Sequence, residues 1–316
     1  MMSPAAVFAN DTFLTYIALV GALLSAVGVL LVLLTGVFHY RITSIWRTYR
    51  SWLVMVPMVL VVLVAGRVAT IVSVAILAAC AFREFARATG LSRDAWMTGA
   101  VYVGIAAVTA SSLVQDPWQH VPGWYGLFMA LPVYVVCLIL IVPIARNRTR
   151  GQLQNSALAV LGFIYVGWMF SHVGFLANST HAYGYLLFLL LAVESNDVAA
   201  FTSGKLLGRR KLREVISPNK TWGGAIGALA FSMALPWLLW FSFPHFGWLQ
   251  LVLAGLIVGV GGQLGDLTLS VIKRDLGVKD MGSLIPGHGG LLDRVDSLIF
   301  TAPLFFHMVR WFYDIY

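Results

Sequence analysis

Charged side chains are scarce in this sequence. Asp, Glu, Lys and Arg together supply 11% of the 316 residues, whereas hydrophobic residues supply 59%. Such a composition excludes an ordinary soluble domain, and the mean hydropathy of +0.85 is typical of a polytopic membrane protein. In that class the positions of the charges matter more than the net charge of +8, and no nucleic-acid partner is expected.

Cysteine is almost as rare, with two residues in the chain. Cys80 and Cys137 each lie within an apolar segment, and they do not have the CxxC spacing. The sequence therefore predicts no disulfide bond, and we expect both thiols to be small core residues.

Long apolar runs are abundant, and they predict an all-α polytopic integral membrane protein of about ten transmembrane helices. The second and third runs are short for a span and are separated only by Arg67, so they form either a tight hairpin or one long, broken segment. The predicted spans are Phe13–Phe38, Trp52–Gly66, Val68–Phe82, Met97–Val114, Trp124–Ala145, Ser156–Ala177, Tyr183–Phe201, Trp222–Phe241, Trp248–Ile272 and Ser297–Tyr313.

The basic residues are distributed unevenly between the two sides of these spans. Nineteen of the 21 Lys and Arg residues fall in one set of alternate loops. The positive-inside rule makes this side cytoplasmic, so both termini are expected to be extracytoplasmic. In that orientation the loops around Arg148, Arg210 and Lys279 lie inside, and Trp118 and His181 lie outside.

Acidic residues with functional potential gather after residue 190. Glu194 and Asp197, in the seventh span, are three residues apart and share a helix face. A charge at that depth is costly unless it is paired, ligated or in contact with water. Pairing with Lys205 or Arg209 is the favoured interpretation for Glu194, whereas for Asp197 pairing and a role in a site stay equally open.

The stretch "SPNKTWGG" begins at Ser217, at the start of the eighth predicted span. Ser before Pro predicts a helix N-cap followed by the first helical residue, and a helix N-terminus with Lys220 beside it would suit an anion. The alternative is an ordinary cap and a lysine that extends to the membrane surface. Gly223 and Gly227 form a GxxxG pair, which predicts close helix packing rather than chemistry.

The stretch "GDLTLSVIKRD" carries Asp266, Ser270 and Lys273 at spacings of four and seven residues. On a helix these residues form one polar stripe in an otherwise apolar span. Simple pairing of Asp266 with Lys273 is one interpretation. The direction of the stripe toward the cytoplasmic face favours the other, an ion or substrate site.

The stretch "LIPGHGGLLDRVDSL" concentrates glycines and charges just before the last predicted span. Gly287, Gly289 and Gly290 allow positive φ and leave the backbone bare, so they predict a nest of N–H groups for phosphate. His288 lies between them and either donates to a phosphate oxygen or is structural.

Asp293 and Asp296, three residues apart, can share one helix face and one metal ion. Carboxylates with water and substrate phosphate are the ligands that Mg²⁺ prefers. Arg294 between them would balance charge or bind phosphate. No Walker A loop is present, and no Cys lies near a His, so these residues predict phosphoryl or nucleotidyl transfer at the cytoplasmic membrane face.

The 27 residues Ser270–Asp296, "SVIKRDLGVKDMGSLIPGHGGLLDRVD", resemble the complete signature of the phosphatidate cytidylyltransferases, or CDP-diacylglycerol synthases. The "SPNKTWGG" stretch, the "GDL" before the signature and "ND…GKLLG" resemble the other cytoplasmic motifs of this family in the same order. The match runs from Asp197 to Ser297, and the first 190 residues resemble the family only in being hydrophobic spans. Two positions depart from the family: Leu269 stands where many members have an acidic residue, and Phe201 replaces a common tyrosine.

The resemblance implies transfer of CMP from CTP to phosphatidic acid, giving CDP-diacylglycerol and pyrophosphate. It implies Mg²⁺ on Asp266, Asp293 and Asp296, with Mn²⁺ as a substitute and a second cation left open. It also implies a homodimer in the bacterial inner membrane. The implied catalytic residues are Asp266, Lys273, Arg274, Asp293 and Asp296. The implied substrate-binding residues are Asp197, Lys205, Ser217, Lys220, Ser270, Lys279, His288, Gly289, Gly290 and Arg294.

Two regions are expected on the same basis. Residues 1–190 would supply packing, lipid access and contact with a second copy. Residues 191–316 would form the catalytic transmembrane domain, with a polar cavity open to the cytoplasm.

Two other functions stay open. A CTP-dependent lipid kinase of the same superfamily would transfer the γ-phosphoryl group, but the intact signature argues against it. A transporter of phosphorylated solutes would suit polar groups within spans, but the two halves lack matching broken helices. A CDP-alcohol phosphotransferase would need a DGxxAR core, which the sequence does not contain.

Overall fold

The computed structural model describes residues 2–36, 43–282 and 289–314. This part of the chain is predominantly helical. The helices are α1 (Asp11–Gly36), α2 (Thr43–Val64), α3 (Arg67–Ala88), α4 (Ala95–Leu113), α5 (Tyr125–Ala145), α6 (Gln152–Leu161), α7 (Phe170–Leu176), α8 (Ala182–Leu207), α9 (Trp222–Leu238), α10 (Trp248–Leu256), α11 (Gly262–Asp275) and α12 (Leu292–Phe312), with short turns η1 (Val7–Ala9), η2 (Leu91–Arg93) and η4 (Trp240–Ser242).

Eight helical segments in the described part of the chain are long and apolar enough to cross a membrane. Two of them, Gln152–Leu176 and Trp248–Asp275, are continuous rods in which a π-helical stretch joins two α-helices. α9 is shorter, with 17 residues, and α12 begins with the charged residues of the last motif. Together these ten segments correspond to the ten predicted spans, so the prediction of an all-α polytopic membrane protein is confirmed.

The region of the second and third predicted spans is a hairpin of two separate helices. α2 ends at Val64, and α3 begins at Arg67. Between them Gly66 has a φ of +93°, a conformation that glycine adopts without a steric cost. The tight hairpin is therefore the correct alternative.

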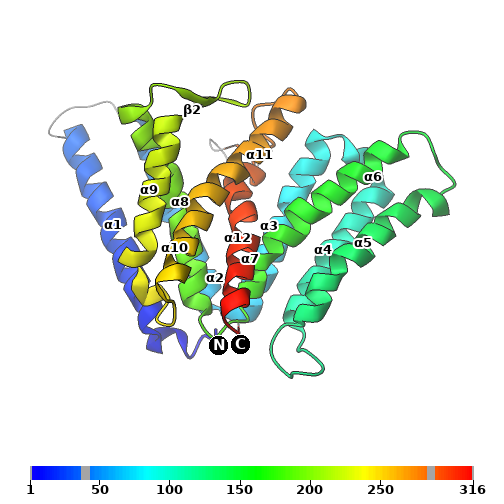
Figure 1. Ribbon diagram of the computed structural model, residues 1–316, viewed down its shortest axis with the longest axis horizontal. Helices are drawn as coiled ribbons and strands as arrows, with labels where there is room; N and C mark the ends of the chain where they lie inside the picture. The colour runs from blue at the N-terminus through cyan, green and yellow to red at the C-terminus, as the bar shows by residue number, and fades with distance from the viewer. Residues whose placement is uncertain (1, 37–42, 283–288, 315–316) are drawn as a thin grey trace.

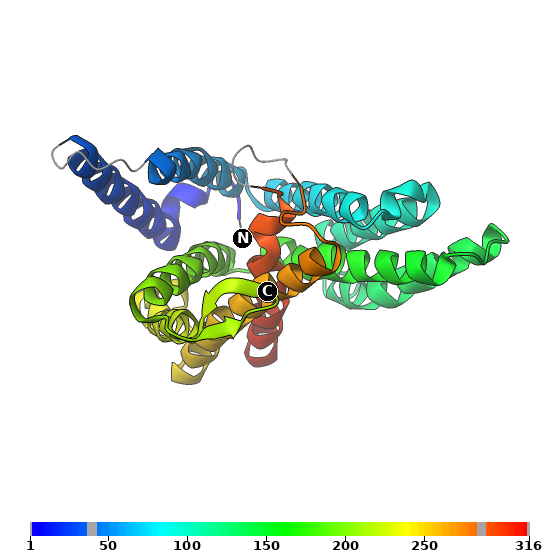
Figure 2. The same cartoon turned by 90° about the horizontal axis from the view of Figure 1, so that it is seen from above.

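The helices are arranged in two unequal groups around α7 and α12. α8 to α11 lie together on one side of the molecule, and α4 to α6 lie on the other (Figure 1). Seen from above, α1 and α2 form an outer wall that continues from α3 (Figure 2). Both chain ends lie at one end of the bundle, here called the terminal end, and the β-hairpin lies at the opposite end, here called the hairpin end (Figure 1).

The β-hairpin is formed by the strands β1 (Lys211–Arg213) and β2 (Ser217–Thr221), which pair in antiparallel fashion. The prediction that Ser217 caps the following helix is therefore wrong. Thr221 caps α9 instead, because its side-chain oxygen accepts the amide of Gly224 at 3.1 Å. A Ser-Pro pair also suits an edge strand, since proline has no N–H to donate there.

α8 and α9 pack closely through glycines. A Cβ on Gly223 would lie 2.7 Å from the carbonyl oxygen of Leu207, and a Cβ on Gly227 would overlap the side chain of Ser203. The predicted packing role of the GxxxG pair is confirmed.

Both cysteines are free, as predicted. Cys80 is partly buried, but Cys137 is exposed on α5, so its assignment to the core is wrong. A small apolar side chain on a membrane span needs no protein around it, because lipid can cover it.

Candidate active site

α11 and α12 cross closely because glycines remove the side chains that would separate them. A Cβ on Gly265 would lie 2.6 Å from the carbonyl oxygen of Asp296 and 2.8 Å from the Cα of Ser297. One turn earlier on α11, the carbonyl oxygen of Gly262 accepts the Ser297 hydroxyl at 3.0 Å. The crossing therefore brings Asp266, the residue after Gly265, next to the start of α12.

Asp266 is paired with a lysine from another element. Lys220 Nζ, at the end of the β-hairpin, lies 2.6 Å from Asp266 Oδ2, and the Ser270 hydroxyl donates to Oδ1 at 3.2 Å. The simple pairing of Asp266 with Lys273 is therefore wrong. The side chains of Lys220 and Asp266 are 25% and 32% exposed, so a ligand can reach this pair.

Asp293 holds the segment between α11 and α12. Lys273 Nζ lies 2.8 Å from its Oδ1, and its Oδ2 accepts the amides of Met281 and Gly290 at 2.8 and 3.1 Å. These three donors occupy most of the lone-pair positions of the carboxylate and leave one on Oδ1. Its carboxylate thus anchors the segment, and its role as a metal ligand stays a prediction.

Asp296 and Asp197 lie within electrostatic range of Asp266, and the three carboxylates are here called the acidic cluster. Asp296 is 6% exposed, and the charges of Asp266 and Asp197 both act on it. Asp197, on α8, is exposed and lies within electrostatic reach of Asp266 and Lys220. Of the two interpretations left open for Asp197, this placement favours a role in the site.

Glu194 lies near a cation of α12 rather than near those of its own helix. The charge of Arg294 acts on it. The predicted pairing with Lys205 or Arg209 is wrong, since no ion pair joins them in the described part of the chain. Lys205 lies over the ring of Phe201 at 4.2 Å instead. Eleven residues of one helix place Lys205 about 16 Å from Glu194, which is too far for an ion pair.

The other predicted residues that the structure describes have different surroundings. Arg274 Nε donates to a backbone carbonyl oxygen in the turn of the β-hairpin at 3.3 Å. Lys279 is exposed in the loop after α11. Gly289 has a φ of +81°, as the predicted nest requires. The predictions for Gly287 and His288 concern positions outside the described residues.

Glu84 contacts the start of α12, a contact that the sequence did not reveal. It lies on α3, is 8% exposed, and its Oε2 accepts the amide of Leu292 at 2.9 Å. The third predicted span ends at Phe82, whereas α3 continues to Ala88, so the sequence places Glu84 outside the span and offers no sign that it is buried. The partner could not be predicted, since Leu292 lies 208 residues further along the chain.

The acidic cluster is suited to a hard cation that arrives with its substrate. In the described residues, no three His, Cys, Asp or Glu side chains are gathered closely enough to hold a metal ion by themselves. Mg²⁺ does not need three protein ligands, because one or two carboxylates with water and substrate phosphates suffice. Asp266 and Asp296 lie on crossing helices, and the charge of Asp266 acts on Asp296. These two carboxylates fit that requirement.

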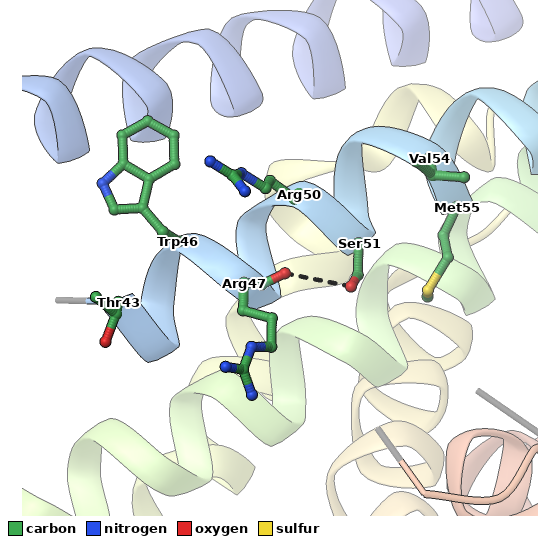
Figure 3. A pocket seen from close by; sticks show the side chains of 7 residues that line it. All are labelled: Thr43, Trp46, Arg47, Arg50, Ser51, Val54 and Met55. Carbon is green, nitrogen blue, oxygen red and sulfur yellow. Dashed lines mark hydrogen bonds between the residues drawn. The ribbon is translucent and has the colours of Figure 1, made fainter. Parts of the chain in front are cut away.

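A separate cavity of about 710 Å³ lies along the first turns of α2. The guanidinium groups of Arg47 and Arg50 extend to different sides of α2, and Val54 and Met55 lie further along the helix (Figure 3). Two cations next to apolar side chains suit an amphipathic anion. The lining residues are Thr43, Trp46, Arg47, Arg50, Ser51, Val54 and Met55.

Comparison with known proteins extends the match beyond the motifs. The sequence model of the family described as "Cytidylyltransferase family" matches residues 45–312. Phosphatidate cytidylyltransferase of Staphylococcus haemolyticus (strain JCSC1435) is 37% identical over 204 residues, which are 64% of this chain and 76% of that protein. The protein of the same name in Staphylococcus saprophyticus subsp. saprophyticus is 35% identical over 204 residues, with the same coverage. Uncharacterized protein YnbB of Escherichia coli (strain K12) is 36% identical over 245 residues, 70% of this chain and 82% of that protein.

Proposed function

The chain belongs to the cytidylyltransferase family, and from that premise we propose that it transfers CMP from CTP to phosphatidic acid, giving CDP-diacylglycerol and pyrophosphate. The observation that carries this proposal is the cluster of Asp197, Asp266 and Asp296 beside Lys220 and Lys273. Both reactants are anions, so the reaction needs fixed cations and carboxylates that bind a further cation. The lipid-kinase and transporter alternatives are not favoured, because the relatives are named as phosphatidate cytidylyltransferases.

The reaction makes one bond and breaks one. A phosphate oxygen of phosphatidic acid bonds to the α-phosphorus of CTP, and the bond from that phosphorus to the oxygen of the leaving pyrophosphate breaks. The attacking oxygen is already anionic, so no general base has to remove a proton. Lys220 and Lys273 form ion pairs with Asp266 and Asp293 in this structure. In the reaction the two lysines would bind the phosphates and neutralise the leaving pyrophosphate.

Mg²⁺, or Mn²⁺ in its place, would be held by Asp266 and Asp296 together with phosphate oxygens of CTP. When bound, it supplies positive charge where the reacting phosphates repel each other. Lys220 pairs with Asp266 in this structure, and Asp197 is a nearby carboxylate that would hold a second cation.

We propose the bacterial inner membrane as the location, with the hairpin end in the cytoplasm and both termini outside. The uneven distribution of the basic residues supports this orientation. It is tested by labelling Arg210→Cys in a variant that lacks Cys80 and Cys137. The new thiol should be protected from an impermeant reagent added outside intact cells, and ready labelling would reverse the orientation.

The N-terminal helices are proposed to admit the lipid and to contact a second copy in a homodimer. Arg47 or Arg50, which extend to different sides of α2, would hold the phosphate of phosphatidic acid while Val54 and Met55 contact its acyl chains. The exposed apolar faces of α1 and α2 are available for lipid or for the second copy.

The experiment that tests the reaction uses purified protein in lipid nanodiscs with phosphatidic acid, diacylglycerol, Mg²⁺ and CTP labelled on the cytidine or on the γ-phosphate. Cytidylyl transfer moves the cytidine label into a lipid with the mass of CDP-diacylglycerol and releases pyrophosphate. A lipid kinase would move the γ-label onto diacylglycerol instead. A folded protein that forms no CDP-diacylglycerol would refute the proposal.

A further inference from the structure

One buried carboxylate ties the N-terminal helices to the start of α12. Glu84 lies near the end of α3 and accepts the Leu292 amide at 2.9 Å. Leu292 is the first residue of α12, so its N–H has no partner within its own helix. A carboxylate at this position is favoured by the helix dipole and by the strength of a hydrogen bond to a charged acceptor. Glu84 thus caps a helix that begins 208 residues away.

Two glycines let this carboxylate approach the chain between α11 and α12. A Cβ on Gly290 would lie 2.6 Å from Glu84 Oε2 and 3.0 Å from Asp293 Oδ2, and a Cβ on Gly282 would overlap Glu84 Oε1. Asp293 holds the same segment through the amides of Gly290 and Met281. The start of α12 is therefore fixed by one carboxylate from α3 and one from α12 itself.

We infer that Glu84 is a positioning residue for nucleotidyl transfer, which fixes the first turn of α12 and through it the place of Asp296. Leu292 and Asp296 are four residues apart, so a shift at the start of the helix moves the Asp296 carboxylate with it. A displacement of about 1 Å in a reacting geometry can reduce the rate on the order of 100-fold. The kinetic part of this inference rests on the proposed function, whereas the structural part does not.

The test compares Glu84→Ala and Glu84→Gln with Asp94→Ala. Asp94 is a matched control, because it is also a buried carboxylate that caps a helix: it accepts the Trp96 and Met97 amides at the start of α4. Glu84→Ala should lower kcat by about 10- to 100-fold, while KM for CTP changes little. Glu84→Gln keeps an oxygen for the Leu292 amide and should recover part of the loss. Asp94→Ala should lower Tm and leave the kcat of the folded enzyme unchanged.

Hydrogen exchange of the amides from residue 291 to residue 296 gives a second measurement that does not depend on activity. Exchange should be faster in Glu84→Ala and unchanged in Asp94→Ala. If the wild-type protein forms no CDP-diacylglycerol, the proposed function fails while the exchange rates still test the anchoring role. Unchanged exchange in Glu84→Ala, or an equal loss of kcat in Asp94→Ala, would overturn the inference.

Discussion

α1 and α11 both belong to membrane spans, but they differ in where their charged residues lie. α1 has a charge only at its start, whereas α11 carries charges along its length. α1 has 26 residues with one acidic residue, Asp11, in its first turn, and most of its side chains are exposed. α11 carries Asp266, Lys273 and Arg274 within 14 residues and crosses α12 at a glycine. The family match begins at residue 45, so it excludes α1 and includes α11.

The difference shows what a membrane helix needs in order to carry chemistry. A helix that faces lipid is stable with apolar side chains all round, because its backbone is satisfied internally. A helix with charges must meet neighbours that bind those charges, so its packing and its function depend on the same contacts. Substitutions in the two regions should therefore have very different effects.

The largest effect is expected when a carboxylate is removed from the crossing of α11 and α12. Asp296→Asn or Asp266→Asn replaces an anionic ligand with an amide, a poor ligand for a hard cation, so kcat/KM should fall by about 100-fold or more. Initial rates over a range of Mg²⁺ concentrations measure it. Asp314→Asn at the terminal end, where Asp314 is 85% exposed and pairs with Arg310, should keep wild-type rates. Near-normal turnover of folded Asp296→Asn would contradict the role of this cluster.

Two glycine substitutions, one in each region, should differ in their effect on the stability of the protein. A Cβ at Gly265 meets the backbone of α12, so Gly265→Ala should destabilise the protein by about 1–3 kcal/mol and lower its activity. Gly21, within α1, has no other atom within 4 Å of where its Cβ would lie, so Gly21→Ala should leave activity and Tm at or above the wild-type level. Thermal unfolding in detergent gives both values. Equal effects of the two substitutions would show that the crossing is not tightly packed.

A smaller, nucleotide-specific effect is expected at Lys220. It lies just before the cap of α9 and is paired with Asp266, so Lys220→Gln should lower kcat/KM for CTP by about tenfold while Tm stays close to wild type. Lys211→Gln is the control, because Lys211 binds a backbone carbonyl oxygen on the same hairpin. Unchanged CTP kinetics in Lys220→Gln would leave Lys273 and Arg274 as the phosphate-binding cations.

The smallest effect concerns pH and stability on the N-terminal side. Burial raises the pKa of Asp94, but hydrogen bonds from Arg146 and from the amides of Met97 and Trp96 outweigh burial and hold this pKa below its ordinary value of 3.8. A lowered pKa stabilises the fold above pH 3.8, and this contribution is lost as the pH falls through the folded-state value. The loss should be about 1 kcal/mol, the size of a helix cap.

Tm measured between pH 7 and pH 3 tests this expectation against Asp94→Asn. Asparagine also caps helices, but it does not titrate. The variant should therefore lack this part of the decrease in Tm at low pH. Parallel curves for the two proteins would show that Asp94 does not contribute to the pH dependence.

The spans could be predicted from the sequence because hydropathy acts locally, residue by residue along the chain. The GxxxG pair that packs α8 against α9 was predictable because its spacing is also a local pattern of the sequence. The cap at Thr221 was missed because Ser217-Pro218 suits both a helix start and an edge strand, and only the pairing with β1 decides between them.

The candidate site was predictable in its composition but not in its pairing. The chemistry of Asp266 and Asp293 was evident from their motifs, yet their partners Lys220 and Lys273 lie 46 and 20 residues away in sequence. Glu84 and Leu292 are further apart still. Which residues become partners depends on how the helices cross, and no local sequence pattern determines a crossing.

The π-helical stretch Ile257–Gly261 has a consequence for insertions and deletions in this rod. Gly255 and Gly259, before and within the π-helical stretch, face α9, whereas Gly261 and Gly265, at its end and after it, face α12. A π-turn contains one residue more than an α-turn, so it rotates the remainder of the rod by about 100°. The single extra residue therefore determines which face of α11 points toward α12. Deleting one residue here would restore a regular helix and turn Asp266 away from Asp296, although every residue of the signature would still be present.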